Sequence, residues 1–232
     1  MIDGKKVLAI IPARGGSKGL PRKNLLEVGG KPLLAWTIIE GLKSRLIDRL
    51  ILSSENHEII ETAGKWGCEA PFTRSQELAT DEATTADVAL HAIEKLEEMY
   101  DYVVLLQPTS PLRSYQDIDI CIEECHKRDA VSCVTVSATD KSPFWMYFLS
   151  ADNHMQAVIE TTNRPTRRQE LPTAYALNGA VYVVKREWFQ ETGKFITKDT
   201  IAHVMPKERS LDIDTELDLN IFRCLATIAE NK

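Results

Sequence analysis

The sequence predicts a three-layer α/β fold in which helices cover both faces of a mostly parallel sheet. Short apolar runs alternate with stretches of helical spacing over the first half of the chain, which is the pattern of strand–helix–strand units. The runs at residues 7–11 and 102–106 are continuous and rich in branched residues, as in strands that are buried on both faces. With 232 residues and 44% hydrophobic content, the chain fits one large domain, or one domain with a small insertion.

The elements are expected in the following order. After the first strand, residues 33–44 have helical apolar spacing, 49–53 form a second strand, and 56–66 form a second helix that stops at Gly67. Ligands of such folds bind at the carboxyl ends of the strands. The remaining expected elements are a helix over 84–99, a strand over 102–106, a helix over 116–128, strands over 130–137 and 178–184, and a helix over 216–230.

The first strand runs into a glycine-rich, cationic loop, IIPARGGSKGLPRKNL (residues 10–25). Gly15, Gly16 and Gly19 let the backbone turn tightly and approach a ligand. Residues 1–31 carry seven Lys or Arg against two acids, whereas the whole chain has 28 basic and 34 acidic residues and a net charge of −6. This local positive charge favours a small anionic ligand over a nucleic-acid surface. The loop matches neither the Walker A pattern nor the Gly-x-Gly-x-x-Gly fingerprint, and a solvated surface loop is the alternative.

A pair of aspartates lies near the C-terminus, in the string SLDIDTE. If residues 211–214 are a strand, Asp212 and Asp214 share one face and Leu211 and Ile213 share the other. Two neighbouring carboxylates repel each other unless a cation or a proton lies between them, and oxygen ligands suit Mg²⁺. The alternative is a cap for the last helix, which Asp214 and Thr215 could form.

The pattern breaks over residues 139–172. SPFWMYFL places four aromatic residues in eight positions, and NRPTRRQ adds three arginines. Clustered aromatics and arginines are typical of a surface that meets a partner. We therefore expect a core made of residues 1–138 and 173–232, with 139–172 as an inserted segment that meets a partner surface. A solvated basic loop that pairs with Glu160 and Glu170 is the alternative.

Four motifs together resemble the CMP-sialic acid synthetase (acylneuraminate cytidylyltransferase) family. They are IPARGGSKGLPRKN, LLQPTSPLR (105–113), LPTAYALNGAVYV (171–183) and LDIDTELDL (211–219), in the family's order and across most of the chain. The resemblance implies a Rossmann-like nucleotidyltransferase domain that transfers CMP from CTP to a nine-carbon 2-keto sugar acid and releases pyrophosphate. It also implies a homodimer in which residues 139–172 are the inserted dimerisation and sugar-contacting segment, which reaches the neighbour's active site.

Within this resemblance, we assign the nucleotide to the glycine-rich loop and to the segment before the third helix. Charge grows on phosphoryl oxygens during the transfer, so catalysis should be mainly positioning and electrostatic stabilisation. Lys23 is the expected main charge stabiliser, with Arg14 and Asp214 as further catalytic residues. Thr85, like Thr84, could also cap the helix. The expected CTP-binding residues are Arg14, Lys18, Lys23, Asn24, Arg74 and Thr85.

The sugar acid and the metal are assigned by the same match. Arg168 would pair with the sugar carboxylate, whereas Phe195 could equally belong to the apolar core. Asp212 and Asp214 are the expected Mg²⁺ ligands, and because no separate general base is evident, metal-assisted deprotonation of the attacking hydroxyl is the hypothesis. The expected sugar-binding residues are Gln107, Arg168, Tyr182 and Phe195.

Two departures from the common N-acetylneuraminate enzymes bear on the sugar. Phe144-Trp145-Met146 follows Pro143, where a basic residue is usual, and Ala176-Leu177 precedes Asn178, where Arg-Pro is usual. A more apolar pocket fits a 6-deoxy sugar, and CEAPFTRSQELA also looks like the legionaminate branch. The sequence therefore favours N,N′-diacetyllegionaminic acid over N-acetylneuraminic acid. An octulosonate (KDO) cytidylyltransferase shares the fold but has a different opening motif.

Two other classes stay open, namely a catalytically silent nucleotide-binding protein and a glycosyltransferase. Pyrophosphate release separates both from a cytidylyltransferase. Five cysteines without metal spacing, no visible signal peptide and no apolar run of about 18 residues lead us to expect a cytoplasmic protein with no membrane or nucleic-acid partner.

Overall fold

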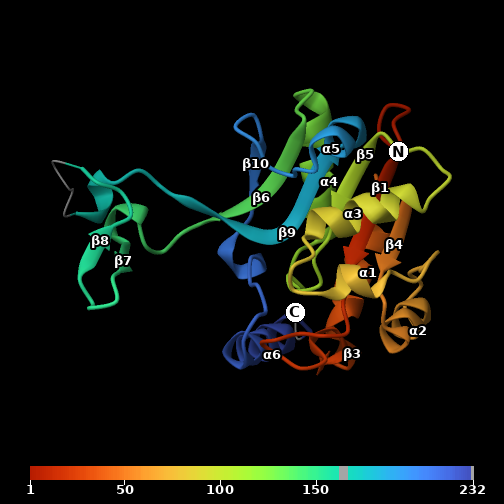
Figure 1. The fold of residues 1–232 in the computed structure, drawn as a ribbon, viewed down its shortest axis with the longest axis horizontal. Coiled ribbons are helices and arrows are strands. Elements are labelled where there is room, and N and C mark those ends of the chain that lie inside the picture. The colour runs from red at the N-terminus through yellow and green to blue at the C-terminus, as the bar shows by residue number, and fades with distance from the viewer. Residues whose placement is uncertain (162–166, 231–232) are drawn as a thin grey trace.

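The computed structural model describes residues 1–161 and 167–230, and within these a six-stranded sheet has the order β10-β6-β9-β5-β1-β4 (Figure 1). β9 is antiparallel to both of its neighbours, and the other pairs are parallel, so the predicted mostly parallel α/β sheet is confirmed. The strands of this sheet are β1 (Val7–Pro12), β4 (Arg49–Ser53), β5 (Tyr102–Leu105), β6 (Ser132–Ala138), β9 (Tyr175–Lys185) and β10 (Ile201–Val204). Two small sheets pair β2 (Glu27–Val28) with β3 (Lys31–Pro32) and β7 (Tyr147–Leu149) with β8 (Met155–Ala157).

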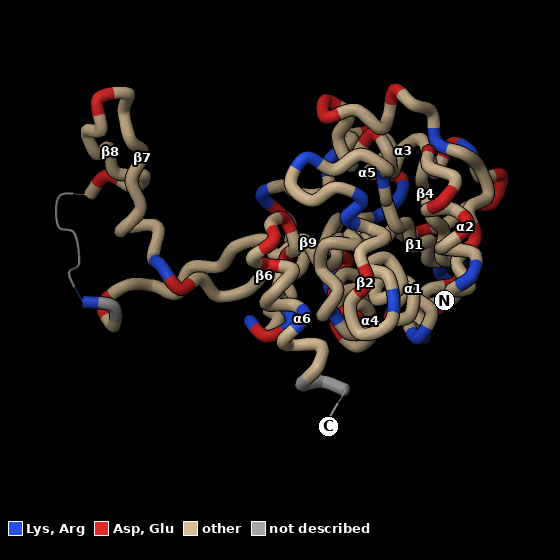
Figure 2. Tube along the Cα trace, turned by 90° about the horizontal axis from the view of Figure 1, so that it is seen from below, with Lys and Arg blue, Asp and Glu red and all other residues tan. Residues whose placement is uncertain are grey.

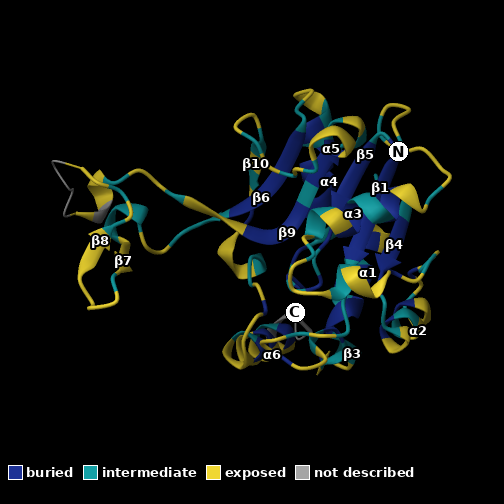
Figure 3. Cartoon of the chain, in the orientation of Figure 1, coloured by how far each residue is buried: buried dark blue, intermediate teal, exposed yellow. Residues whose placement is uncertain are grey.

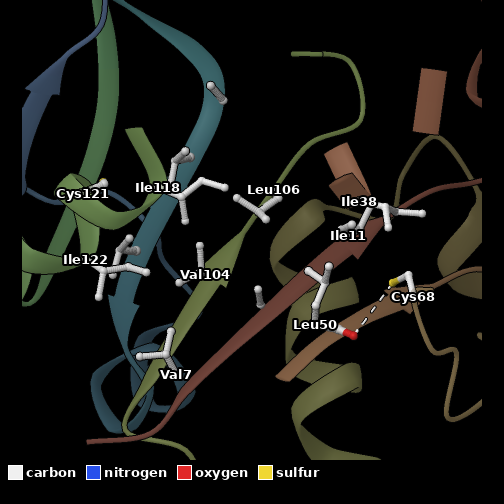
Figure 4. Packing of buried hydrophobic residues seen from close by; sticks show 14 of the residues in the cluster. Val7, Ile11, Ile38, Leu50, Cys68, Val104, Leu106, Ile118, Cys121 and Ile122 are labelled. Carbon is white, nitrogen blue, oxygen red and sulfur yellow. Dashed lines mark hydrogen bonds between the residues drawn. The ribbon is translucent and has the colours of Figure 1, made fainter. Parts of the chain in front are cut away.

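Helices cover both faces of the sheet because alternate residues of its strands are buried on opposite sides. On β1, Ala9 and Ile11 pack into a cluster with α1, α2 and α4, part of which is shown in Figure 4, whereas Leu8 and Ile10 pack with α3 and α5. This double burial explains the unbroken apolar runs in the sequence. The helices are α1 (Leu33–Lys43), α2 (His57–Lys65), α3 (Thr85–Glu94), α4 (Tyr115–Lys127), α5 (Arg186–Thr192) and α6 (Glu216–Glu230).

A third apolar cluster lies beneath the cationic loop and the aspartate segment, which is the string SLDIDTE at residues 210–216. Phe222 of α6 is fully buried there with Leu20 and Ile213, and its ring meets Trp36 edge-on at 5.0 Å between centroids. Leu20 comes from the cationic loop, and Ile213 lies between the two aspartates. The last helix therefore fixes both segments to one support.

The structure corrects the sequence prediction at several elements. The helix expected over 84–99 ends at Glu94, because Leu96 and Tyr100 turn back onto the apolar cluster below α3 before β5 begins. Residues 211–214 are not a strand of the sheet. They are attached to the turn after β5 by a backbone hydrogen bond, which the Ile213 amide donates to the Thr109 carbonyl at 2.8 Å. The edge strand β10 and the helix α5 were not predicted, because both are short. The strands of the two small sheets were not predicted either.

The segment proposed as an insertion forms an arm that extends away from the sheet beyond β6 and β9, in both views of the chain (Figures 1 and 2). Its short hairpin, β7–β8, is mostly exposed, in contrast to the buried strands of the main sheet (Figure 3). Phe148 and Leu149 are 65% and 66% exposed. Residues 162–166 of this segment lie outside the described residues. In the described part of the chain, no helix has both the length and the apolar character needed to cross a bilayer.

Candidate active site

A cleft of about 440 Å³ opens at the carboxyl edge of the sheet. Its walls come from the cationic loop after β1, the segment between β4 and α3, the turn after β5 and the aspartate segment. These segments are far apart in the sequence but meet there because parallel strands end at one edge. Most of the residues that sequence analysis assigned to the nucleotide line this cleft, namely Arg14, Lys23, Asn24, Arg74 and Thr85.

The cationic loop lies directly against the aspartate segment. A Cβ at Gly19 would stand 2.3 Å from the Asp214 carbonyl oxygen, so this close approach requires glycine. The Lys23 ammonium donates to the Ile213 carbonyl at 2.9 Å and to the Asp214 carboxylate at 3.0 Å. Because the Lys23 side chain is only 12% exposed, its charge is held at one place on the cleft wall.

Arg14 and Lys18 of the cationic loop share an acidic partner that sequence analysis missed. Asp81 pairs with Arg14 at 2.9 Å and with Lys18 at 2.8 Å. The hydrogen bond from Lys18, and then that from Arg14, lowers the pKa of the Asp81 carboxyl. Arg14 also donates to the Thr80 carbonyl at 3.3 Å, so the segment between β4 and α3 bends over the cationic loop.

The buried Asn24 amide donates to the Arg14 carbonyl at 3.0 Å, which holds the backbone of the cationic loop. This contact gives Asn24 a role in shaping the loop beside the phosphate or ribose contact that we expected. Thr84, rather than Thr85, caps α3, because its hydroxyl accepts from the Asp87 amide in a capping box. Thr85 lines the cleft at the first turn of α3.

Arg74 lies almost fully buried in the cleft wall, 4% exposed, and forms an ion pair of 2.6 Å with Glu55. Glu55 also accepts from the Gly15 amide at 2.6 Å. Burial acts to raise the pKa of Glu55, but the Gly15 amide and the Arg74 guanidinium more than offset it, so the pKa lies below its usual value. Sequence analysis missed Glu55, which follows β4 without a motif of its own.

The turn after β5 is held from below by Arg113, which is 1% exposed. Its guanidinium donates to the Gln107 carbonyl at 2.9 Å and to the Ala180 carbonyl of β9 at 2.8 Å. The Ser110 hydroxyl adds a bond of 3.1 Å to the Asn178 carbonyl. Gln107 and Thr109 are thereby fixed in the cleft wall, and Gln107 is the expected sugar-binding residue that the structure places there.

The other three expected sugar-binding residues lie elsewhere. Among the described residues, the cleft lining includes neither Tyr182 nor Phe195. The two rings are neighbours at 5.7 Å, and Phe195 packs on Phe189 of the core at 4.4 Å, as the apolar-core alternative expected. Arg168 begins a short turn of the arm, and its side chain lies outside the described residues. Sugar contacts by these three residues stay predictions.

Asp212 and Asp214 both line the cleft, while Ile213 between them is buried. Burial raises the pKa of Asp212 and the charge of Asp214 adds to it, against the opposing effects of Thr109 and Lys23. Thr215 caps α6 in a capping box, because its hydroxyl accepts from the Asp218 amide at 3.3 Å and the Asp218 carboxylate accepts from the Thr215 amide at 2.8 Å. Asp214 is therefore not needed as the cap.

These two carboxylates fit a magnesium ion. They are oxygen donors, and the charge of Asp214 disfavours the charged form of Asp212 until a cation comes between them. Across the described residues, no group of three or more His, Cys, Asp or Glu side chains is placed to hold a metal. A two-carboxylate site suits Mg²⁺, which keeps several waters and shares its remaining positions with substrate phosphates.

Comparisons with known proteins agree with this geometry. Residues 8–194 match the family model described as Cytidylyltransferase. Pseudaminic acid cytidylyltransferase of Campylobacter jejuni is 35% identical, over 95% of this chain and 96% of the relative. CMP-N,N′-diacetyllegionaminic acid synthase of Legionella pneumophila is 33% identical, over 92% of this chain and 93% of the relative. N-acylneuraminate cytidylyltransferase of Escherichia coli is 31% identical, over 98% of this chain and 53% of the relative.

Solved structures share the fold at low sequence identity. A CMP:2-keto-3-deoxy-manno-octonic acid synthetase in complex with CTP superposes with a TM-score of 0.72 at 18% identity, over 98% of this chain and all of that one. A 4-diphosphocytidyl-2C-methyl-D-erythritol synthase from Anaerococcus prevotii gives 0.70 at 15%, over 97% of this chain and all of that one. The family match over most of the chain, with relatives near one-third identity, shows that the chain belongs to the cytidylyltransferase family and is a nucleotidyltransferase.

Proposed function

We propose that this nucleotidyltransferase transfers CMP from CTP to a nine-carbon 2-keto sugar acid and releases pyrophosphate. The observation that carries the proposal is the contact of Lys23 with Asp214, because it brings a cationic phosphate loop and a paired-carboxylate site to one wall of one cleft. The names of the relatives supply the class of sugar, since they act on pseudaminic, legionaminic and N-acylneuraminic acids.

In the proposed reaction, the anomeric hydroxyl of the sugar attacks the α-phosphorus of CTP. A new oxygen–phosphorus bond forms, the bond to the β-phosphate oxygen breaks, and pyrophosphate leaves with the electron pair while the hydroxyl loses its proton. Lys23 would stabilise the charge that grows on the phosphoryl oxygens, and Arg14 and Lys18 would hold the outer phosphates. Because the Lys23 side chain is already fixed, little reorganisation is needed when this charge develops.

Asp212 and Asp214 would hold Mg²⁺ in this scheme. When bound, the ion supplies charge neutralisation and lowers the pKa of a coordinated hydroxyl. Asp212→Asn is expected to abolish most Mg²⁺-dependent turnover in a folded protein. A Mg²⁺ titration of activity that matches the parent enzyme would show that Asp212 is not a ligand.

For the nucleobase we propose Arg74 and Thr85, which face the cleft from the segment before α3 and from its first turn. For the sugar we propose Gln107 in the cleft, together with Arg168, Tyr182 and Phe195. Since Arg168 belongs to the arm, its contact with a sugar would be made in the cleft of a second copy of the chain.

We further propose that the chain forms a homodimer through the arm, with residues 139–172 as the inserted segment and 1–138 with 173–232 as the core. The proposal is supported by the exposed apolar side chains of the β7–β8 hairpin, including Phe148, Leu149 and Met155. An isolated two-stranded hairpin is marginally stable in water, and a second copy would cover this one.

Among nonulosonic acids we propose N,N′-diacetyllegionaminic acid. Phe144 to Met146 and the pair Ala176-Leu177 supply apolar surface where charged residues are usual in the N-acetylneuraminate enzymes. Pseudaminic acid is the second candidate, because its cytidylyltransferase matches this chain at 35% identity against 33% for the legionaminate enzyme. N-acetylneuraminic acid is the third.

The test is pyrophosphate release with Mg²⁺ and CTP, with legionaminic, pseudaminic, N-acetylneuraminic and KDO acids offered in parallel. Release with N,N′-diacetyllegionaminic acid far above the others is the expected result. Release with another of the nonulosonic acids would replace the sugar but keep the reaction. No release with any of them, from folded protein that binds CTP, would favour the silent nucleotide-binding alternative.

A further inference from the structure

The short segment that follows β4 touches both sides of the cleft. The Ser53 carbonyl accepts from the Ala13 amide at 3.1 Å, at the start of the cationic loop. The next carbonyl, of Ser54, accepts from the Arg74 amide at 2.9 Å, in the segment before α3. The proposed phosphate-binding and base-binding segments are therefore both attached to this one stretch of backbone.

The Glu55 side chain repeats this double attachment with a charged group. One carboxylate oxygen accepts from the Gly15 amide at 2.6 Å, and the other accepts from the Arg74 guanidinium at 2.6 Å. The Glu55 side chain is 8% exposed and that of Arg74 is 3% exposed. The chain also approaches Gly15 closely, since a Cβ at this position would stand 2.6 Å from Nδ2 of the Asn56 side chain.

A buried carboxylate beside a triphosphate site needs a function, because its negative charge opposes the ligand. Arg74 matches the charge of Glu55, so the two side chains together are close to neutral. Arg74 then offers its remaining N–H groups as directional donors rather than as a net positive charge. Its Nε is buried and has no hydrogen-bond partner among the described residues. A buried donor of this kind requires an acceptor, which a ligand in the cleft would supply.

We propose that Glu55 is a positioning residue that fixes the spacing between the cationic loop and Arg74 and cancels the charge of Arg74. The consequence is that Arg74 binds the uncharged acceptor atoms of a pyrimidine ring instead of competing with the cationic loop for phosphate. The inference rests on the proposed function, in which the triphosphate occupies the cationic loop and the base lies near Arg74.

The proposal is tested with Glu55→Gln. An amide has a single acceptor oxygen, so either Gly15 or Arg74 would face an N–H group, and Arg74 would regain its net charge. Calorimetric titration in the presence of Mg²⁺ and without any sugar would measure the affinities for CTP, UTP and inorganic tripolyphosphate. We expect CTP to bind about tenfold or more weakly, because a hydrogen bond to a charged group is lost or misaligned. The ratio of the affinity for CTP to the affinity for UTP should also fall. Tripolyphosphate should bind as tightly as before or more tightly.

Glu69→Gln is the matched control, because Glu69 forms a two-point pair with Arg49 at the opposite end of β4, with distances of 2.7 and 3.0 Å. It should leave all three affinities unchanged. Glu55→Asp keeps the negative charge but is shorter, so tripolyphosphate affinity should match the wild type while CTP affinity stays reduced. Thermal unfolding of each variant shows that it is folded.

The opposite responses of CTP and tripolyphosphate distinguish this role from a structural one. Equal losses for both ligands would reduce Glu55 to a support of the fold and overturn the proposal. The proposal would also be overturned if the CTP affinity of Glu55→Gln, and its ratio of CTP affinity to UTP affinity, both stayed within twofold of the wild type. If the folded wild type binds no CTP, the proposed function falls together with this inference, whereas CTP binding that is insensitive to Glu55 removes only the inference.

Discussion

The cleft and the arm differ in whether their characteristic side chains have partners within the chain. In the cleft wall, Lys23 and Arg74 each have an acidic partner from a distant part of the same chain. On the arm, by contrast, Phe148 and Leu149 remain about two-thirds exposed, at 65% and 66%. The cleft is therefore organised by contacts within one chain, whereas the arm offers apolar surface that the chain itself does not cover. This difference supports the proposal that the nucleotide binds to the core and that the arm contacts a second copy and the sugar.

The largest effect is expected from removal of the central cation of the cleft. Lys23→Ala should lower kcat by about 10²- to 10³-fold, because a fixed charge at the developing negative charge is lost. The fold should persist, since the Asp214 side chain is 70% exposed and can be hydrated instead. Pyrophosphate release at saturating CTP measures the loss, and Lys43→Ala on α1 is the control. Near-wild-type turnover would remove Lys23 from the mechanism.

Changes on the arm should affect dimerisation and sugar binding rather than CTP binding. The double variant Phe148→Ser with Leu149→Ser should shift the protein to monomers, because it removes two large apolar side chains that are exposed in the single chain. We expect the sugar KM to rise by about tenfold while CTP affinity is unchanged. Light scattering gives the mass, and titration gives the CTP affinity. An unchanged dimer would place the interface elsewhere, and a loss of CTP affinity would break the separation between cleft and arm.

The next largest effect is expected where the cationic loop approaches the aspartate segment. Gly19→Ala should destabilise the protein by roughly 1–3 kcal/mol, because the new methyl group would stand 2.3 Å from the Asp214 carbonyl oxygen and force the backbone apart. Gly16→Ala on the same loop is the matched control for stability, since a Cβ there meets nothing within 4 Å. Denaturant unfolding compares the two variants. Equal stabilities would mean that this approach is not needed for the fold.

The smallest effect concerns the acid at the cleft mouth. Asp81→Asn should make CTP bind roughly two- to fivefold more tightly at low salt, because Arg14 and Lys18 would no longer have to leave an ion pair. The gain should shrink at high salt, where exposed pairs are screened. Asp152→Asn on the arm is the control. Weaker CTP binding would instead show that Asp81 organises the cations for the ligand.

Much of the fold followed from local pattern alone. The strand over 49–53 and the helix over 216–230 have the predicted bounds, because period and stop signals act over neighbouring residues. In the site, the glycine-rich loop and the string SLDIDTE pointed to Lys23 and the two aspartates, and the structure brings all three to the lining of one cleft although residues 211–214 form no strand. Phe195 was harder, since an apolar residue after a helix has no local sign that separates core from pocket.

The sequence by itself determined the alternation of strands and helices and the local excess of positive charge, because each depends on residues a few positions apart. Only the tertiary structure decided which acids meet which cations. Lys23 and Asp214 are 191 positions apart, and Glu55 lies 40 positions from Gly15 and 19 from Arg74. Such pairs depend on which strands lie side by side in the sheet and on the common edge at which they end, and local sequence carries no signal for either.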